Sequence, residues 1–177
     1  MNITVYCGAA TGNDPAYLQA AQELGEWIGR NGHTLVWGGG GTGLMGAVAN
    51  AALAAGAPAI GVIPDFLLEL ETPPAGFTNY QVTTTMAERR TRMIELADAF
   101  VALPGGPGTL EELSEVMALI KLRRCAKPLI LANINGYYEP LAATYQTMVD
   151  HGFIPAEILS HLQLASSIQD LTKLLSE

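Results

Sequence analysis

The sequence predicts a single Rossmann-like α/β domain over residues 1–177, with a doubly wound, mainly parallel sheet and helices on both faces. Short apolar runs alternate with helical patterns along the chain, as they do in proteins built from β-α-β units. Hydrophobic residues make up 49% of the chain and charged residues 15%, which suits a buried sheet covered by helices. Because no repeat or long linker divides the chain, we expect one domain whose ligand site lies beyond the carboxyl ends of the strands.

Seven runs have the length and composition of strands. The run at 99–103 is apolar throughout, as expected of a strand that is buried on both faces of a parallel sheet. The run at 162–164 is the weakest of the seven. The expected strands are Ile3–Cys7, Thr34–Trp37, Ala59–Ile63, Tyr80–Val82, Ala99–Leu103, Pro128–Leu131 and Leu162–Leu164.

Six segments between these strands predict helices. Pro15 stands at a helix start, where its missing N–H costs little, and Asp14 before it is a candidate N-cap. Gly32 and Gly56 stand just past helix ends, where glycine forms left-handed caps. The stretch Glu71–Gly76 predicts a loop within the domain. The expected helices are Pro15–Arg30, Leu44–Ala55, Thr85–Ala97, Leu110–Leu122, Tyr137–His151 and Ser167–Leu175.

Composition excludes several classes of function. The net charge of −8 argues against nucleic-acid binding, because phosphate backbones are held by clustered lysines and arginines. Cys7 and Cys125 have no CxxC spacing, and His33, His151 and His161 have no metal-ligand spacing, so we expect no metal. The chain shows neither a signal peptide nor an apolar run long enough to span a bilayer, so we expect a cytoplasmic protein without a membrane partner.

A run of glycines at Gly38–Gly46 follows the second expected strand and opens a helix. It contains the spacing GxGxxG at Gly41, Gly43 and Gly46, and Asp65 lies near the distance expected of a ribose-binding acid in dinucleotide-binding proteins. However, the motif follows the second strand rather than the first, and it has more glycines than the fingerprint needs. The alternative is a loop whose glycines only let a strand and a helix pack closely.

A second glycine loop, Pro104–Thr109, follows the buried strand at 99–103. It lacks the GK[ST] ending of a Walker A loop, which disfavours a triphosphatase. Thr109 and Glu112 have the spacing of a capping box, which would explain both residues without any function. Glu112 also borders the apolar stripe of its helix, whereas Glu111 lies on the solvated face, so Glu112 is equally a candidate catalytic carboxylate.

The helix at 85–97 carries an arginine on its apolar face. Arg89 shares that face with Met86 and Met93, and because a buried guanidinium keeps its charge, Arg89 needs an anionic partner. That partner is either a carboxylate in a structural ion pair or the phosphate of a ligand. Arg90 flanks the same face. Arg92 is expected on the surface, paired with the two glutamates at helical spacing, Glu88 and Glu95.

Taken together, these features resemble a known family. The segment Pro104–Glu112 matches the PGGxGTxxE motif of the Lonely guy (LOG) phosphoribohydrolases, which older descriptions call "possible lysine decarboxylases". The resemblance extends over nearly the whole chain. Further matching segments are Tyr6–Gly8, Gly43–Gly46, Gly61–Pro64, Met86–Arg90 with Met93, Ala97–Phe100, Lys127–Pro128 and Gly152–Ile154.

The resemblance implies hydrolysis of the N-glycosidic bond of AMP-type or cytokinin riboside 5′-monophosphates, with release of the base and ribose 5-phosphate. It implies Arg89 and Glu112 as the catalytic pair, no cofactor, a homodimer, and a nucleoside monophosphate as the small-molecule partner. Glu112 would stabilise positive charge on the sugar and activate water, and Arg89 would anchor the nucleotide or orient Glu112. The substrate-binding residues implied are Gly39, Gly40, Gly43, Met45, Glu71, Arg90, Gly105, Gly106, Gly108 and Thr109.

Three other functions fit parts of the same pattern. A non-catalytic carrier of the same fold, similar to the molybdenum-cofactor carriers, would bind a phosphorylated ligand without cleaving it. A dinucleotide-dependent oxidoreductase would use the Gly41–Gly46 segment and Asp65. A decarboxylase would need a lysine that holds pyridoxal phosphate, and Lys121, Lys127 and Lys173 stand in no recognisable setting for it.

Overall fold

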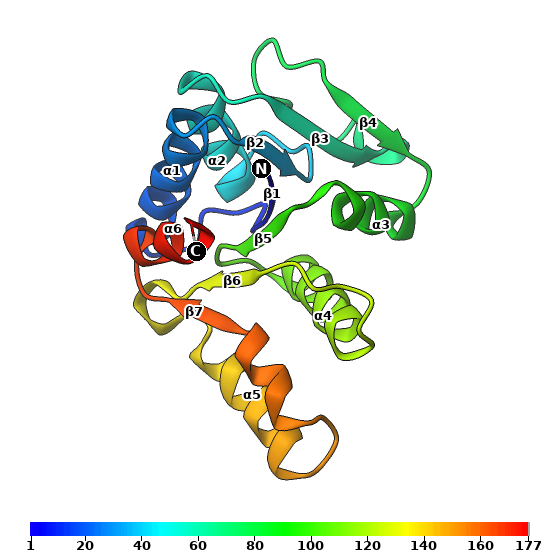
Figure 1. Ribbon diagram of the computed structural model, residues 1–177. Coiled ribbons are helices and arrows are strands. Elements are labelled where there is room, and N and C mark those ends of the chain that lie inside the picture. The colour runs from blue at the N-terminus through cyan, green and yellow to red at the C-terminus, as the bar shows by residue number, and fades with distance from the viewer. Residues whose placement is uncertain (177) are drawn as a thin grey trace.

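The computed structural model describes Met1–Ser176 and contains one seven-stranded sheet in the order β4-β3-β2-β1-β5-β6-β7. All six pairings between neighbouring strands are parallel, with Val5 of β1 beside Val101 of β5 in the centre. The expected parallel sheet is therefore confirmed (Figure 1). The strands are β1 (Asn2–Tyr6), β2 (Thr34–Trp37), β3 (Ala59–Pro64), β4 (Tyr80–Thr83), β5 (Ala99–Ala102), β6 (Leu129–Ala132) and β7 (Gln163–Ala165).

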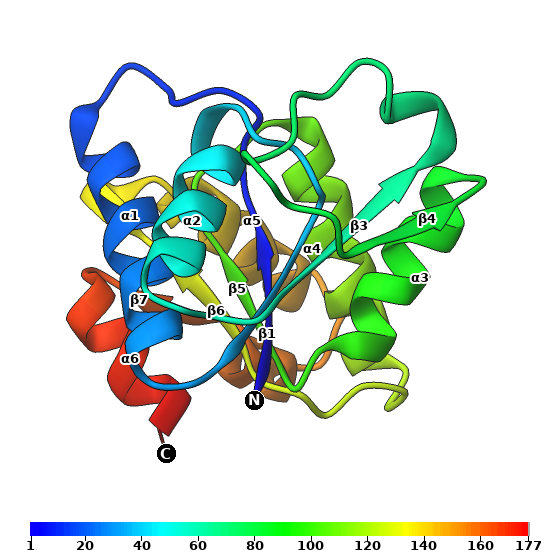
Figure 2. The same ribbon diagram turned by 90° about the horizontal axis from the view of Figure 1, so that it is seen from above.

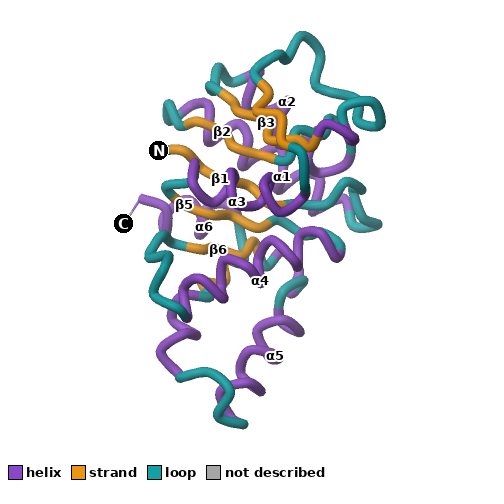
Figure 3. Tube along the Cα trace, turned by 90° about the vertical axis from the view of Figure 1, so that its right-hand side faces the viewer, coloured by secondary structure: helices purple, strands orange, loops and turns teal. Residues whose placement is uncertain are grey.

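Helices cover both faces of the sheet. The helices α1 (Pro15–Arg30), α2 (Gly43–Ala54) and α6 (Ile168–Ser176) pack on one face. On the other lie α3 (Met86–Leu96), α4 (Pro107–Lys121) and α5 (Glu139–Asp150). In Figure 3, α3 and α4 pass in front of the strands. Short 3-10 helices lie in three of the connections: η1 (Asp65–Leu67), η2 (Ile134–Gly136) and η3 (Ala156–His161). No helix of the described chain is long and apolar enough to cross a membrane.

Alternate residues of each strand supply the two cores. In β1, Ile3 and Val5 pack among the residues of α1 and α2, whereas Tyr6 packs on the opposite face with residues of α3 and α4. The same alternation places Trp37 on the first face and Phe100 on the second. Full burial of an aliphatic side chain of this kind contributes about 1.5–3 kcal/mol, so both faces have to be covered by helices.

The topological switch point lies between β1 and β5. From β1 the chain adds β2, β3 and β4 on one side, then returns and adds β5, β6 and β7 on the other. The loops that follow β1 and β5 therefore leave the sheet in opposite directions and open a crevice at its carboxyl edge, where ligands of doubly wound sheets bind. In Figure 2 this edge is at the top, and both termini lie at the opposite edge.

The expected boundaries hold to within a few residues, and the caps expected for α1 and α2 are present. The Asp14 carboxylate accepts a hydrogen bond from Ala16 N at 2.9 Å. Gly32 and Gly56 have φ values of 67° and 85°, so both adopt the left-handed conformation expected past helix ends.

The start of α4 differs from the prediction. The helix begins at Pro107 and its N-cap is Gly106, so Thr109 is already inside the first turn. Proline is favoured at this first helical position because its fixed φ is helical and the N–H it lacks would have no partner. The expected capping box of Thr109 and Glu112 is therefore wrong, and Glu112 is left without a capping role.

Candidate active site

A cavity of about 480 Å³ occupies the crevice at the switch point. The loop after β1 forms one wall, and the start of the second glycine loop forms another. Two tyrosine rings, Tyr17 from α1 and Tyr137 from the segment after β6, face each other edge to face, with their centroids 5.5 Å apart. The lining residues are Gly8, Ala9, Ala10, Thr11, Gly12, Asn13, Tyr17, Leu44, Pro104, Gly105, Gly106 and Tyr137.

The second glycine loop presents backbone donors at the start of α4. Among the described residues, no hydrogen bond uses the N–H groups of Gly106, Gly108 or Thr109. A Cβ atom on Gly105 would lie 2.7 Å from Cβ of Thr109, so only glycine allows the loop to fold back onto the helix. Because free N–H groups and the helix dipole both favour an anion, this turn is suited to a phosphate group.

In the first glycine loop, Gly38–Gly46, other backbone groups of the protein occupy N–H donors at the start of α2. The N–H groups of Leu44 and Met45, in the first turn of α2, donate to the carbonyl oxygen of Gly8 at 3.1 and 3.3 Å. A side chain on Gly43, whose φ is 57°, would collide with the backbone of Ala9. Close packing therefore explains Gly43, and two of the N–H donors that a dinucleotide would need at this helix start are occupied.

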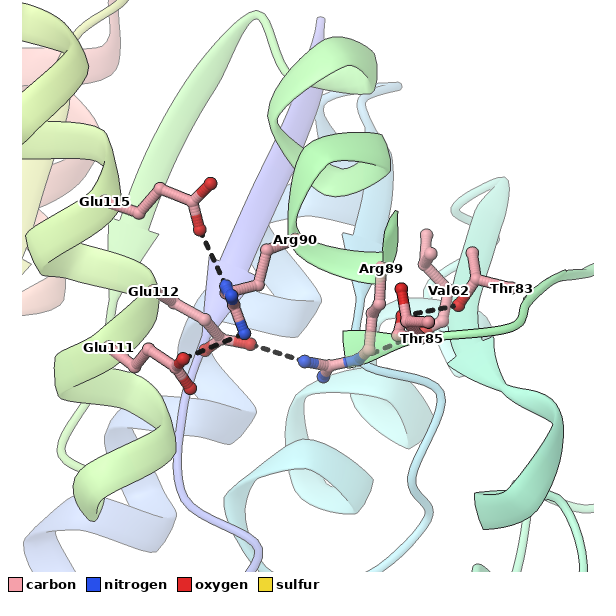
Figure 4. A network of polar contacts seen from close by, with 8 residues as sticks. All are labelled: Val62, Thr83, Thr85, Arg89, Arg90, Glu111, Glu112 and Glu115. Atoms are coloured by element: carbon pink, nitrogen blue, oxygen red, sulfur yellow. Dashed lines mark hydrogen bonds and ion pairs between the residues drawn. The ribbon is translucent and has the colours of Figure 1, made fainter. Parts of the chain in front are cut away.

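A buried ion pair joins α3 to α4. Arg89 Nη1 donates to Glu112 Oε1 at 2.7 Å, and Arg89 Nε donates to the carbonyl oxygen of Val62 at 3.1 Å (Figure 4). The two residues are only 8% and 7% exposed. The anionic partner that Arg89 requires is thus a carboxylate of this chain, and that carboxylate is the expected catalytic glutamate.

The environment of Glu112 favours its neutral form more than water would. Burial raises the pKa of its carboxyl group, and the adjacent Arg89 guanidinium opposes that rise. Burial, reinforced by the Glu112 charge, also raises the pKa values of Tyr6 and Cys7, so both stay neutral beside it. The Arg89 contact holds one carboxylate oxygen in a fixed direction in a site of low dielectric, where its charge acts strongly on a neighbouring group.

Arg90, the residue after Arg89, also joins α3 to α4. Arg90 Nε donates to Glu115 Oε2 at 2.6 Å, and Arg90 Nη1 lies 2.9 Å from Glu111 Oε1 (Figure 4). Arg90 therefore does not line the cavity. It links α3 to α4 beside the Glu112 pair.

The expected surface pairing of Arg92 is half right. Arg92 pairs with Glu95 at 3.0 Å and donates to Gln81. It does not contact Glu88, and that expectation is wrong because Glu88 caps its own helix: Glu88 Oε2 accepts from Thr84 N at 2.8 Å.

A second group of expected site residues gathers at the carboxyl ends of β2 and β3. A Cβ atom on Gly40 would lie 2.7 Å from both Glu71 Oε2 and Met45 Cε. Gly39 and Glu71 also line a small recess of about 30 Å³. The loop at 71–76 therefore reaches back over the first glycine loop, and Glu71 and Met45 lie together there.

Sequence reasoning missed the aromatic donors that hold both glycine loops. Tyr138 Oη donates to the Leu103 carbonyl oxygen and Tyr137 Oη to that of Gly105, both at 2.6 Å. In the first loop, Trp37 Nε1 donates to Gly40 O at 3.0 Å and Tyr80 Oη donates to Gly39 O at 3.1 Å. The available signal for the tyrosine pair was its place after an Asn-Gly turn at the carboxyl end of a strand.

Within the described residues, no group of three or more histidine, cysteine, aspartate or glutamate side chains is placed to hold a metal ion. The polar groups at the carboxyl edge of the sheet are instead backbone N–H donors, tyrosine hydroxyls and one buried ion pair, whose two residues are not among those that line the cavity. This set can hold an anion and stabilise developing positive charge.

Comparison with known proteins agrees with the fold and the motifs. The family model described as "Possible lysine decarboxylase" matches residues 45–175. The chain is 40% identical to the cytokinin riboside 5′-monophosphate phosphoribohydrolase LOG of Oryza sativa subsp. japonica, over 99% of this chain and 72% of that protein. It is also 40% identical to the cytokinin riboside 5′-monophosphate phosphoribohydrolase of Rhodococcoides fascians, over 95% of this chain and 85% of that protein.

Among solved structures, the Moco carrier protein of Chlamydomonas reinhardtii matches with a TM-score of 0.72 at 25% identity, over 99% of this chain and 94% of that one. The molybdenum cofactor binding protein of Rippkaea orientalis matches with a TM-score of 0.71 at 21% identity, over 99% and 93%, a likeness of fold alone.

A parallel sheet with a glycine loop at its switch point places the chain in the Rossmann-like class of α/β proteins with a site for a phosphorylated small molecule. Within that class, this chain is 40% identical to the two phosphoribohydrolases and 25% identical to the Moco carrier protein of Chlamydomonas reinhardtii. The chain belongs to the LOG family of cytokinin riboside 5′-monophosphate phosphoribohydrolases.

Proposed function

We propose that this protein hydrolyses the N-glycosidic bond of AMP-type nucleoside 5′-monophosphates, including cytokinin riboside 5′-monophosphates. The observation that carries the proposal is the buried Arg89–Glu112 pair beside the second glycine loop. In the reaction the bond between C1′ and the base nitrogen breaks. The hydroxyl of a water molecule goes to C1′ and a proton goes to the base, which gives free base and ribose 5-phosphate.

Glu112 is the residue proposed to act on the reacting carbon. Breaking a glycosidic bond develops positive charge on the sugar ring, as in other reactions with an oxocarbenium-like transition state. A carboxylate next to C1′ stabilises that charge and can accept a proton from the attacking water. Arg89 is proposed to keep Glu112 ionised and oriented, which the 2.7 Å contact between them supports.

The second glycine loop is proposed to hold the 5′-phosphate. The unpaired N–H groups of Gly106, Gly108 and Thr109 supply donors, and the start of α4 supplies a favourable dipole. Gly39, Gly40, Gly43, Met45, Glu71 and Gly105 complete the proposed binding set, among which Met45 and Glu71 lie nearest the first glycine loop. Arg90, which pairs with Glu111 and Glu115, is proposed to hold α4 against α3 beside the site. No cofactor takes part in the proposed reaction.

We also propose that the protein acts as a homodimer in the cytoplasm. Among the described residues, apolar side chains available to a second copy include Val82 on the edge strand β4 and Leu110 on α4, which are 53% and 47% exposed. An unpaired strand edge with an exposed apolar side chain is a favourable surface for association. Sedimentation equilibrium of the purified chain tests the dimer.

The placement of the lysines disfavours a decarboxylase. Lys121 Nζ donates to the Phe153 carbonyl oxygen and Lys127 Nζ donates to that of Ile94, both at the end of the sheet opposite the glycine loops. Lys173 lies on α6 beside Asp170. None of the three can reach the cavity at the switch point.

The proposal is tested by incubating the protein separately with AMP and with N6-isopentenyladenosine 5′-monophosphate and separating the products by chromatography. Equimolar release of free base and ribose 5-phosphate is expected. A preference for the prenylated nucleotide would indicate activation of a hormone precursor. Tight binding of both nucleotides with no release of base would favour a carrier of the same fold and overturn the hydrolase.

A further inference from the structure

A tyrosine from a distant part of the chain holds the peptide group at the centre of the second glycine loop. Tyr137 follows β6 and η2, and its hydroxyl donates to the carbonyl oxygen of Gly105 at 2.6 Å. The loop itself follows β5. Tyr137 therefore belongs neither to the Arg89–Glu112 pair nor to the loop that it contacts.

The turn before Tyr137 is built to hold it in place. Asn135 and Gly136 have φ values of 53° and 77°, so both adopt the left-handed conformation and turn the chain back over the sheet edge. Asn135 Nδ2 donates to Asp14 Oδ2 at 2.8 Å, which ties this turn to the start of α1.

Two further tyrosines, Tyr138 and Tyr17, support Tyr137 and the loop. Tyr138 is buried, and its hydroxyl donates to the Leu103 carbonyl oxygen at 2.6 Å, directly before the loop. The ring of Tyr17 packs edge to face on Tyr137. Two consecutive tyrosines thus hold two carbonyl groups of the same strand end and loop.

The hydrogen bond from Tyr137 fixes the direction of a different group. In a trans peptide the C=O of Gly105 and the N–H of Gly106 point in opposite directions. Holding the carbonyl oxygen against Tyr137 therefore directs the Gly106 N–H to the other side of the loop, at the start of α4. Because both residues are glycines, this peptide group could otherwise rotate at little cost and turn its carbonyl oxygen toward a bound anion.

We propose that Tyr137 is a positioning residue for the phosphate site: its hydroxyl keeps the Gly105–Gly106 peptide in the orientation that offers an N–H donor to the anion. The identity of the anion, the 5′-phosphate of a nucleoside monophosphate, rests on the proposed function. The contribution of Tyr137 is confined to phosphate-bearing ligands, and it leaves the chemistry at C1′ unchanged.

The test compares Tyr137→Phe, which removes the hydroxyl and keeps the ring, with Tyr145→Phe, which removes a hydroxyl from the core around α5. Calorimetric titration measures binding of ribose 5-phosphate, AMP and adenosine. For Tyr137→Phe we expect affinity for the two phosphorylated ligands to fall about tenfold while adenosine binding is unchanged. The KM for AMP rises by a similar factor, and kcat stays within about twofold. Tyr145→Phe leaves all of these values as in the wild type.

A second variant keeps the hydroxyl and loosens its support. Asn135→Gly tolerates the left-handed conformation and removes the contact with Asp14, so a smaller loss confined to phosphorylated ligands is expected. Unchanged affinities in Tyr137→Phe, or an equal loss for adenosine, would overturn the role of Tyr137. If the wild type binds AMP and releases no base, the proposed hydrolase fails while the binding comparison still decides the role of Tyr137.

Discussion

The guanidinium group of Arg89 occupies the space that a side chain on Gly38 would fill. A Cβ atom built on Gly38 would collide with Arg89 Nη2 and lie 3.2 Å from the sulfur of Met45. Gly38 is the first residue after β2, so the end of this strand is shaped to admit the arginine from α3. The glycine run thus contributes to the ion pair as well as to the packing of α2.

A Gly38→Ala substitution is expected to displace Arg89 and with it the Glu112 carboxylate. Because a shift of about 1 Å at a catalytic group costs on the order of 10²-fold in rate, kcat for base release should fall by about that factor. Gly56→Asn is the matched control, since Gly56 lies past the other end of α2 in open space and asparagine tolerates its φ of 85°. Wild-type turnover in Gly38→Ala would contradict the expectation.

Replacing Glu112 tests its proposed role directly. Glu112→Gln keeps the shape of the side chain and removes the charge that stabilises the sugar cation, so kcat for release of adenine from AMP should fall on the order of 10³-fold. Glu111→Gln provides the comparison, because Glu111 is the preceding residue of the same helix and its side chain is 55% exposed. Equal rates for the two variants, measured by chromatography of free base, would remove Glu112 from the mechanism.

Removal of Arg89 should make the free energy of unfolding depend more strongly on pH than it does in the wild type. In Arg89→Met the Glu112 carboxyl stays buried without its partner, which costs about 3–5 kcal/mol when the group is ionised. Burial already raises the pKa of Glu112, and loss of the opposing guanidinium raises it further. When the pKa of a carboxyl is higher in the folded state than in the unfolded state, the folded protein is more stable with that carboxyl protonated. The free energy of unfolding of the variant therefore falls as pH rises through the folded-state pKa.

Urea unfolding at pH 5 and pH 8 measures this effect, and the difference from wild type should be larger at pH 8. Arg92→Met is the control, because its pair with Glu95 is 42% and 57% exposed and such pairs contribute about 0–1 kcal/mol. A deficit for Arg89→Met that is the same at both pH values would show that lost packing, and not the Glu112 charge, sets its stability.

The occupied start of α2 predicts that the protein does not bind a dinucleotide. The Leu44 and Met45 N–H groups already donate to Gly8 and the Gly46 N–H donates to Thr42, so among the described residues only the Gly43 N–H is left for a pyrophosphate in the first turn. Fluorescence titration with NADH should show no saturable binding in the micromolar range. AMP, in contrast, is expected to bind at the second glycine loop. Saturable micromolar binding of NADH that AMP does not displace would support the hypothesis that the GxGxxG segment binds a dinucleotide.

The sheet and its helices were predictable because strands buried on both faces leave continuous apolar runs, and the run at 99–103 is the strongest of them. The need of Arg89 for an anion was also predictable, since its place in an apolar stripe is a local property of one helix. The helical pattern alone leaves its partner open between a carboxylate and a ligand phosphate, because the contact depends on how α3 and α4 pack on the same face. Only the family resemblance points to Glu112.

Other features depended on contacts that no local pattern encodes. The GxGxxG spacing looks the same whether a phosphate or the Gly8 carbonyl accepts from the helix, so only the path of the loop after β1 separates the two. The support that Tyr137 gives to Gly105 joins residues 32 positions apart. The start of α4 differs from the prediction because the helical preference of Pro107, and not the Thr109–Glu112 spacing, decides where the helix begins.

The PGGPGT segment is not a self-contained part that could be moved into another protein. The Gly8 N–H donates to the Pro104 carbonyl oxygen at 3.0 Å, while the Gly8 carbonyl oxygen accepts from the start of α2. The first turn of the loop is thus fixed by a neighbouring strand end. A designer who grafts this segment onto a different sheet would need a backbone donor in the position of Gly8 and an adjacent helix to hold that donor, or the grafted loop would lose its shape.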